Sequence, residues 1–456
     1  MSPGPVREAA RSVPAAADVD LCVVGGSSTG VFAAVAAARL GARVAIVESH
    51  GFFGGMATAA LVAVWHTTLD TEFKKTIIAG LTAEVLERLR RRGALLEPRP
   101  DGNLAYIFNP EELKIELDAL VRQAQVRPFL HARFAAPAVE DGRLVAAVIE
   151  DKSGRRAIRA RCFIDATGDG DLVARAGLPF RKLADLQPPT ACAVLRGLGA
   201  LAEKNPGFSL SRAVFDPRLA GALPAGFLWT AAVAGAPDCT LVAGTRVSGA
   251  DCSEADGLTG AEMEGRRQVR AMLDLLRANF VGGAEVSLAA LGAQIGVRET
   301  RHAECRHALT EAEVLSGARF PDAIAQGSYR VDVHHSDKPG ITFRYLNGRE
   351  VYIEADGTRQ EGRWRPETAQ NPTFYQIPYR SLVPRGPGAE NVLVAGRLLD
   401  ADRGAYGAVR VMVNCNQTGE AAGTAAFLAL DSGTAVAEVN PQRLRAALSR
   451  GGAAIL

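Results

Sequence analysis

The chain has 456 residues, of which 48% are hydrophobic and 22% charged, and its formal net charge is +2. This length can bury a large core spread over two or three domains. The near-neutral charge argues against a nucleic-acid or membrane-surface partner, and no apolar run reaches the length of a membrane span.

Seven cysteines are scattered along the chain without a C-x-x-C pair. This pattern is typical of a reducing compartment and offers no zinc or iron–sulfur ligand set, so we predict no metal site. Residues 1–17 lack the continuous apolar core of a signal peptide and are expected to be a disordered lead-in. The expected location is the cytoplasm.

The first predicted unit is a strand, a glycine turn and a helix near the N-terminus. Val19–Val24 is an apolar run, residues 25–30 read GGSSTG, and the alanine-rich residues 29–40 favour a helix. A second apolar run over residues 43–47 ends in Glu48. A helix N-terminus has free N–H groups and the positive end of a dipole, which favour a pyrophosphate. The pattern predicts a dinucleotide-binding turn with Glu48 on an adenosine ribose; the alternative is a tight turn in an empty βαβ unit.

Three later stretches favour FAD over NAD. GFFGGMAT at 51–58 follows Glu48, and its glycines allow the backbone to pass close to a ligand. CFIDATGDGD at 162–171 is typical of a strand that runs into a glycine turn, and NVLVAGR at 391–397 of another. A helix of small residues at 418–426, which can press closely against a cofactor, follows the last turn.

Further strings in this order carry a family resemblance: GGMAT, FIDATGDGD, TRVSG before GAEMEGRRQ, GVRETR, VDVHH, IPYRSLVP and AGRLLDADRGAYGAVRVMVNCNQTGEAAGTAA. They resemble the two-dinucleotide-binding-domain flavoproteins related to glutathione reductase, and more narrowly the FAD-dependent oxidoreductase family of that group. The similarity covers nearly the whole chain after about residue 18.

The resemblance implies an α/β fold with a Rossmann-like FAD-binding domain of the glutathione-reductase type. This domain is expected to be discontinuous, over residues 18–190 and 375–456, with an α+β substrate domain inserted at 191–374. Within the insertion, residues 261–279 predict an amphipathic helix, and the runs on either side of Asn347-Gly348 predict a β-hairpin.

The resemblance also implies which residues contact FAD. The pyrophosphate and ribose contacts are Gly25, Ser27, Ser28, Thr29, Gly30 and Glu48. Those along the ribityl chain and the flavin edge are Gly54, Gly55, Met56, Ala57, Thr58, Gly396 and Arg397. Those near the adenosine are Arg133, Phe134, Ala166, Thr167 and Gly168.

Ser27 departs from the usual glycine, but it is small and its hydroxyl could donate to a phosphate. A helix that starts near Gln417, with Thr418 and Gly419, would point its N-terminus at the flavin pyrimidine ring, where Arg410 could add positive charge. We expect the FAD to be bound non-covalently; attachment at Cys415, which precedes this helix, is the alternative.

Candidates for substrate binding and proton transfer are His66, Tyr406, Arg298, Arg301 and His334. The two arginines could clamp a carboxylate, although they share a face only if their segment is helical. His334 and His335 are adjacent, so on a strand at most one of them reaches the flavin. For His66 the alternative is a partly buried histidine bonded to the backbone, and for Tyr406 it is a simple packing role.

The sequence therefore predicts an FAD-dependent dehydrogenase or oxidase that moves a hydride from a small organic substrate to flavin N5. It has one dinucleotide fingerprint and lacks the paired cysteines of disulfide reductases, so oxygen or an external acceptor is expected to reoxidise the flavin. Two alternatives stay open: a monooxygenase that uses NAD(P)H and oxygen, and a flavin-carrying subunit of a larger redox complex. A homodimer is also left open.

Overall fold

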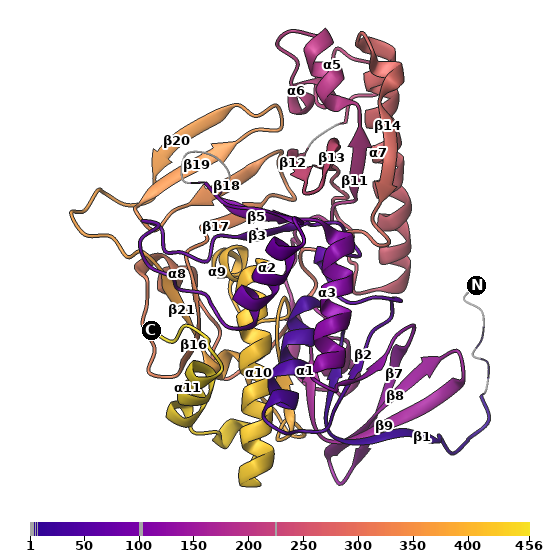
Figure 1. Cartoon of the computed structure of the whole chain (residues 1–456), viewed down its shortest axis with the longest axis vertical. Coiled ribbons are helices and arrows are strands. Elements are labelled where there is room, and N and C mark those ends of the chain that lie inside the picture. The colour runs from indigo at the N-terminus through magenta and orange to yellow at the C-terminus, as the bar shows by residue number, and fades with distance from the viewer. Residues whose placement is uncertain (1–3, 5, 7, 100–103, 224–225) are drawn as a thin grey trace.

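The computed structural model describes residues 4, 6, 8–99, 104–223 and 226–456. Its main sheet has seven strands in the order β6-β2-β1-β9-β8-β7, with β22 paired to the free side of β9 beyond the hairpin (Figure 1). The strands are β1 (Ala15–Val24), β2 (Val44–Val47), β6 (Arg127–Phe129), β7 (Arg133–Glu140), β8 (Arg143–Asp151), β9 (Gly154–Asp165) and β22 (Val392–Val394). The pairs that involve β7 and β8 are antiparallel, and all others are parallel.

The register of the parallel strands brings distant parts of the chain to one edge. Val24 is aligned with Val47 on one side and with Asp165 on the other, and Asp165 is aligned with Val394. The segments that follow these four residues therefore leave the sheet together, at the carboxyl edge where α/β proteins bind nucleotides.

The helices of the described residues are α1 (Ser28–Arg39), α2 (Leu81–Arg91), α3 (Pro110–Gln123), α4 (Asp171–Arg175), α5 (Leu198–Lys204), α6 (Leu210–Val214), α7 (Ala255–Asn279), α8 (Glu311–Ser316), α9 (Arg403–Val409), α10 (Met412–Ser432) and α11 (Pro441–Arg450). Helices α1, α3, α4 and α10 pack against the main sheet, and the other helices pack on the smaller sheets or on one another. Short 3-10 turns lie at η1 (Gly55–Ala57), η2 (Gly283–Glu285), η3 (Tyr379–Leu382) and η4 (Val436–Glu438). None of the helices in the described ranges is both long and apolar enough to cross a membrane.

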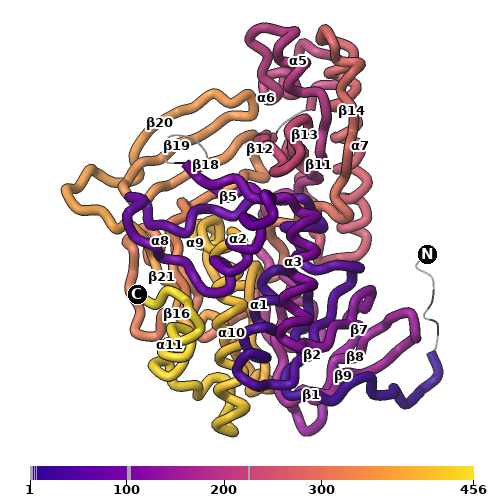
Figure 2. Tube along the Cα trace, in the orientation of Figure 1, coloured from indigo at the N-terminus to yellow at the C-terminus, as the bar shows by residue number. Residues whose placement is uncertain are grey.

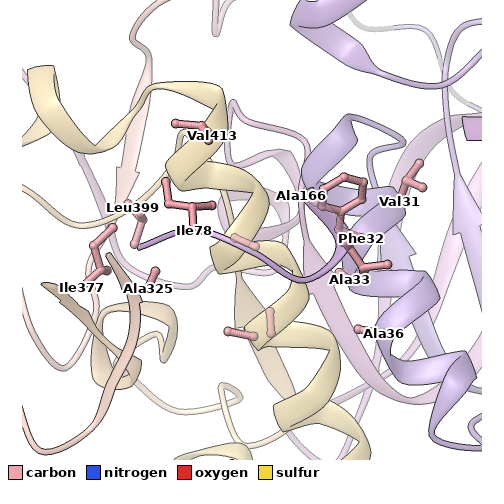
Figure 3. Packing of buried hydrophobic residues seen from close by; sticks show 14 of the residues in the cluster. Val31, Phe32, Ala33, Ala36, Ile78, Ala166, Ala325, Ile377, Leu399 and Val413 are labelled. Carbon is pink, nitrogen blue, oxygen red and sulfur yellow. The ribbon is translucent and has the colours of Figure 1, made fainter. Parts of the chain in front are cut away.

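Helix α1, from the N-terminal part of the chain, packs closely against α10, from the C-terminal part (Figures 1 and 2). At Gly419 a Cβ would lie 2.1 Å from the carbonyl oxygen of Thr29, and at Gly423 it would lie 2.0 Å from that of Ala33. Only glycine permits this backbone approach. Figure 3 shows Ala33 and Ala36 on α1 next to α10, so small side chains line the contact.

The remaining strands form smaller sheets. One has the order β12-β13-β11-β14, built from β11 (Cys192–Arg196), β12 (Trp229–Val233), β13 (Ala236–Ala243) and β14 (Ser287–Leu291). Another has β17 (Val331–His334), β18 (Ile341–Arg344), β19 (Arg349–Ile353) and β20 (Arg359–Arg363) in chain order. The smallest combine β3 (Val64–His66), β5 (Ala105–Phe108) and β4 (Leu95–Leu96), β10 (Phe180–Lys182) with β15 (Arg301–Ala303), and β16 (Ala323–Gly327) with β21 (Tyr375–Pro378).

The N-terminal strand–turn–helix–strand unit and the hairpin around Asn347-Gly348 form as the sequence predicts. The helix predicted over 261–279 begins earlier, at Ala255. The lead-in predicted over 1–17 is shorter, because Ala15 and Ala17 already pair with β9; residues 1–3, 5 and 7 of it lie outside the described residues. The domain boundaries at 190 and 375 stay a prediction.

Candidate active site

A cavity of about 640 Å³ lies at the carboxyl edge of the main sheet and is lined by the turns after β1, β2, β9 and β22 and by the start of α10. Most of the predicted FAD contacts lie on its wall. They are Gly25, Ser27, Ser28, Thr29, Glu48, Gly54, Gly55, Met56, Arg133, Phe134, Ala166, Thr167, Gly168, Gly396, Arg397 and Arg410. Four segments far apart in sequence therefore face one space, which we call the outer cavity.

The turn after β1 is a tight crossing of two backbones. Gly25 has φ +103°, and a Cβ there would lie 2.5 Å from the carbonyl carbon of Ala166. At Gly30 a Cβ would lie 1.9 Å from the oxygen of Gly25, so this glycine lies beneath the cavity wall and allows α1 to start against the turn. Ser27 has φ −60°, which needs no glycine, and its Oγ accepts from the N–H of Gly30 at 3.3 Å as the cap of α1.

The second glycine loop lies against the first. The N–H of Gly54 donates to the oxygen of Gly26 at 2.9 Å, and at Gly55 a Cβ would be 2.8 Å from that of Ser27. Two neighbours predicted as contacts, Ala57 and Thr58, are turned away from the outer cavity: both are buried, and the Thr58 hydroxyl donates to the oxygen of Phe53 at 2.8 Å.

Glu48 ends β2 as a buried carboxylate on the cavity wall. It accepts from the N–H of Gly26 at 2.9 Å, from that of His50 at 2.8 Å and from the Ser49 hydroxyl at 3.0 Å. Burial alone would raise the pKa of Glu48, but the hydrogen bonds from His50 and Ser49 outweigh burial and leave this pKa below its usual value. The side chain is an ionised acceptor at the position predicted for the ribose contact.

The prediction for the last helix requires a correction. α10 starts at Met412, five residues before Gln417, so that Gln417, Thr418 and Gly419 lie beyond its first turn and do not line the outer cavity. Gln417 exchanges hydrogen bonds with the backbone of Gln326, and the Thr418 hydroxyl accepts from the N–H of Gly396 at 3.0 Å. These residues hold the helix in place.

The helix start that does line the outer cavity consists of Met412, Cys415 and Asn416. Both Oδ1 and Nδ2 of Asn416 are buried, and neither has a hydrogen-bond partner among the described residues. Burial raises the pKa of the Cys415 thiol to about 12, and its Sγ lies 3.2 Å from the oxygen of Arg410. The structure therefore presents an amide with an unused donor and acceptor, and a protonated thiol.

A second cavity of about 800 Å³, the inner cavity, opens beside the first. The two share Met56, Val297, Arg397, Arg410 and Met412 on their walls. The rest of the inner cavity is formed by β3, β5, β12 and β17 to β20, and it is rich in apolar and aromatic side chains. This arrangement fits a ligand that reacts with a group held in the outer cavity.

Three of the five catalytic candidates, His66, Arg298 and His334, line the inner cavity. Arg301 does not: its segment is the strand β15 and not a helix, and its guanidinium donates to the oxygens of Asp169 (3.0 Å) and Ser253 (2.8 Å). Tyr406 is fully buried outside both cavities. Its hydroxyl donates to the carbonyl of Arg298 at 2.8 Å, so it positions that arginine.

His334 belongs to a buried polar cluster that the sequence analysis missed in part. Its Nδ1 lies 2.6 Å from an Arg246 nitrogen and its Nε2 lies 3.1 Å from Oδ1 of Asp332. Because arginine can only donate, Nδ1 is the acceptor and Nε2 carries the proton toward Asp332. Asp332 also accepts from the Tyr329 hydroxyl at 2.7 Å and lies 3.4 Å from Arg410.

His66 faces the same cavity from β3, with its ring 3.9 Å from that of Tyr329. Burial and the charge of Arg330 lower the pKa of His66 to about 3, so the imidazole is neutral above that pH. Among the described residues, the ring nitrogens of His66 have no hydrogen-bond or ion-pair partner. The ring nitrogens are therefore free to hydrogen-bond a ligand, but the imidazole is a weak base in the free protein.

A model of the FAD dependent oxidoreductase family matches residues 20–448. The chain belongs to this family. It is therefore an FAD-dependent enzyme, with a mixed α/β fold that includes a Rossmann-like FAD-binding part. The outer cavity fits the cofactor for two reasons. The N-terminus of α1, which favours a phosphate, follows the glycine turn on its wall, and the unpaired amide of Asn416 lies near the start of α10.

Several solved structures are similar to this chain over most of its length, at low sequence identity and with TM-scores below 0.5. A geranylgeranyl bacteriochlorophyll reductase-like protein from Thermoplasma acidophilum is 13% identical over 95% of this chain and 83% of that one, with a TM-score of 0.47. The p-nitrophenol 4-monooxygenase of Pseudomonas putida DLL-E4 is 12% identical over 95% and 86%, with a TM-score of 0.45. A myxobacterial chondrochloren halogenase is 12% identical over 95% and 79%, with a TM-score of 0.45. No curated protein sequence matches the chain significantly.

Proposed function

We propose that this flavoenzyme is a dehydrogenase or oxidase whose small organic substrate binds in the inner cavity. The observation that carries the proposal is the shared wall of the two cavities, formed by Met56, Val297, Arg397, Arg410 and Met412. A substrate in the inner cavity would lie next to a cofactor in the outer one, and FAD supplies an acceptor for a hydride when it is bound.

We further propose how the chain holds the cofactor. The first turn of α1, from Ser27 to Thr29, would bind the pyrophosphate, and Glu48 would accept from the ribose hydroxyls. The amide of Asn416 and the guanidinium of Arg410 would face the polar edge of the flavin. The strand order of the main sheet, with its antiparallel hairpin beside parallel strands, supports the glutathione-reductase type of FAD-binding domain.

His66 is the proposed proton acceptor for the hydroxyl or amine of the substrate. Two observations support this role: His66 lines the inner cavity, and its ring nitrogens have no hydrogen-bond partner among the described residues. Its low pKa makes it a weak base in the free protein, so the role requires that the bound substrate raise this pKa. The members of the Asp332–His334–Arg246 cluster contact one another and would hold the wall of the cavity in place. His334 would thus position its neighbours and would not transfer a proton.

An anaerobic screen tests the proposal. The purified holoenzyme is mixed with small alcohols, amines and acids, and the oxidised flavin absorbance is followed without NAD(P)H. A substrate should bleach the flavin band in the absence of oxygen, and His66→Ala should slow that bleaching. Reduction only by NAD(P)H, with oxygen-dependent hydroxylation of the added compound, would instead establish the monooxygenase alternative and overturn the proposal.

A further inference from the structure

The inner cavity contains more positive than negative charge. Arg298, Arg330 and Arg410 line it, and Arg246 lies directly behind His334. Among the described residues, the only ion pair that these four arginines make is the one between Arg410 and Asp332, at 3.4 Å. Arg246, Arg298 and Arg330 take part in no ion pair within the described part of the chain.

Nearby carboxylates offset only part of this surplus: Asp332 interacts electrostatically with Arg246, Arg298 and Arg330, and Glu299 interacts with Arg410. Four arginines thus face two carboxylates. His334 is neutral, since its Nδ1 accepts from Arg246 and burial lowers its pKa well below the usual value. Glu361 and Arg349 also line the cavity, but these two side chains are about half exposed and pair with each other at 3.1 Å. An unpaired charge in a partly buried cavity destabilises the free protein, and a bound anion would remove that penalty.

Two of the arginines present unused donors to the cavity. Arg298 binds the oxygens of Pro188 and Thr190 through Nη1 alone, both at 2.6 Å, which leaves Nη2 and Nε without a described partner. Arg330 has its guanidinium 4.0 Å from the centre of the Phe343 ring, and its buried Nε has no hydrogen-bond partner among the described residues. A guanidinium stacked on a ring keeps its N–H edges free for a planar anion.

The other walls favour an apolar body on the ligand. Phe227, Trp229, Ile341 and Phe343 contribute aromatic and aliphatic surface to the inner cavity. A ligand that satisfies both parts of the wall has a charged end and an apolar remainder. A carboxylate is the planar anion that matches a guanidinium edge with paired hydrogen bonds.

We propose that the substrate is an organic acid whose carboxylate is bound by Arg298 and Arg330 and whose apolar body lies against the aromatic wall of the inner cavity. This inference rests on the proposed function, because it assumes that the inner cavity is the substrate site. The pair Arg298 and Arg330 replaces the predicted pair Arg298 and Arg301, because Arg301 donates to the backbone oxygens of Asp169 and Ser253.

The test compares acids with their amides on the FAD-loaded enzyme. Benzoate, phenylacetate and phenylpropionate are titrated by isothermal calorimetry against benzamide, phenylacetamide and phenylpropionamide, which have nearly the same shape without the charge. At least one acid should bind about tenfold or more tightly than its amide, as expected for hydrogen bonds to a charged group. Amides that bind as well as their acids throughout the panel would overturn the proposal.

Variants locate the site within the cavity. Arg298→Met and Arg330→Met should each reduce the preference for the acid to within about twofold, whereas Arg349→Met, which removes a charge already paired with Glu361, should retain it. The FAD content and unfolding temperature of each variant establish that it is folded. A preference that survives both substitutions in folded holoenzyme would contradict the assignment.

The two proposals fail differently. If the acids bind through the arginines but no acid, alcohol or amine bleaches the flavin, the proposed dehydrogenase or oxidase activity is wrong and the acid site stands. If a neutral compound bleaches the flavin and acids show no preference over amides, the activity stands and the acid site is wrong.

Discussion

Asn416 is the residue on the wall of the outer cavity that has the most hydrogen-bonding capacity free for a cofactor. Its amide is buried on the wall of the outer cavity with neither end hydrogen-bonded to a described residue, whereas the nearby Asn414 donates to the Tyr375 hydroxyl at 3.0 Å and to the Ala408 oxygen at 3.1 Å. Other buried polar atoms also lack partners, Asn414 Oδ1 among them, but of these only Asn416 Oδ1 and Nδ2 and Arg410 Nε belong to residues on the wall of the outer cavity.

We therefore expect Asn416→Ala to raise the Kd for FAD by about tenfold, equivalent to about 1.4 kcal/mol, while the unfolding temperature of the FAD-free protein stays the same or rises. Asn414→Ala should instead lower that temperature, because it removes two internal hydrogen bonds. Fluorescence titration with FAD and thermal unfolding measure the two quantities. A fall in stability with unchanged FAD affinity in Asn416→Ala would contradict the role.

His66 supports a second prediction at this scale. If it accepts the substrate proton, His66→Ala should lower the rate of flavin reduction by about a hundredfold without loss of bound FAD. His335→Ala is the control, since His335 bonds to the Thr342 hydroxyl at 2.7 Å and is not on the wall of the inner cavity. Equal rates in the two variants would remove His66 from the mechanism.

The pH dependence follows from the same residue. A pKa of about 3 leaves His66 unprotonated in the free enzyme at all higher pH values, so kcat/KM should show no acidic limb from this group near the usual histidine pKa of about 6.5.

At the scale of elements, the contact between α1 and α10 depends on glycines. A methyl at Gly423 would lie 2.0 Å from the oxygen of Ala33, so Gly423→Ala must push the helices apart. We expect a loss of about 1–3 kcal/mol in stability and weaker FAD binding, because both helices start at the outer cavity.

Gly260→Ala is the matched control. Gly260 lies in α7 with nothing within 4 Å of the added Cβ, so this substitution should be neutral or stabilising. Thermal unfolding of both variants makes the comparison, and an unchanged unfolding temperature in Gly423→Ala would contradict the packing.

A buried acid on the same helix makes stability depend on pH. Burial raises the pKa of Glu420 to about 7, although it accepts from the N–H of Leu81 at 3.1 Å. Because the folded protein holds this proton more tightly than the unfolded chain, the contribution of Glu420 to stability falls as pH rises from about 4.5 to about 7 and is constant above that.

Replacement by glutamine removes this titration. The stability of Glu420→Gln relative to the wild type should increase by about 3 kcal/mol between the two ends of that pH range. Denaturant unfolding at several pH values measures it. A difference between variant and wild type that does not change with pH would show that folding does not raise the pKa of Glu420.

At the scale of the whole molecule, the parts of the site that sequence could predict are those with local signals. Glycine turns after apolar strands are such signals, and the parallel register then places Gly25, Glu48, Ala166 and Gly396 on the wall of one cavity. The start of α10 was placed too late because its cap, Val411, makes no side-chain hydrogen bond and so leaves no signal. The small residues at 418–426 are helical as predicted, but they pack against α1 and not against the cofactor site.

The arginine cluster has no local signal at all. Arg246, Arg298, Arg330 and Arg410 come from four separate segments, and only the tertiary fold brings them to the inner cavity. The sequence does contain a signal for the neighbouring pair Asp332 and His334. They lie two residues apart on a strand and therefore share a face. The predicted carboxylate clamp of Arg298 and Arg301 does not form. Residues three apart share a face only on a helix, and Arg301 starts the strand β15.

The most direct test of the account is the ratio of bound FAD to folded chain in the wild type, Gly30→Glu and Arg330→Met. The account predicts about one FAD per chain in the wild type and in Arg330→Met, whose change lies in the inner cavity, and almost none in Gly30→Glu, where the new side chain would meet the oxygen of Gly25. Folded wild-type protein that binds no FAD, or Gly30→Glu protein that retains it, would contradict the convergence of these distant turns on one cofactor.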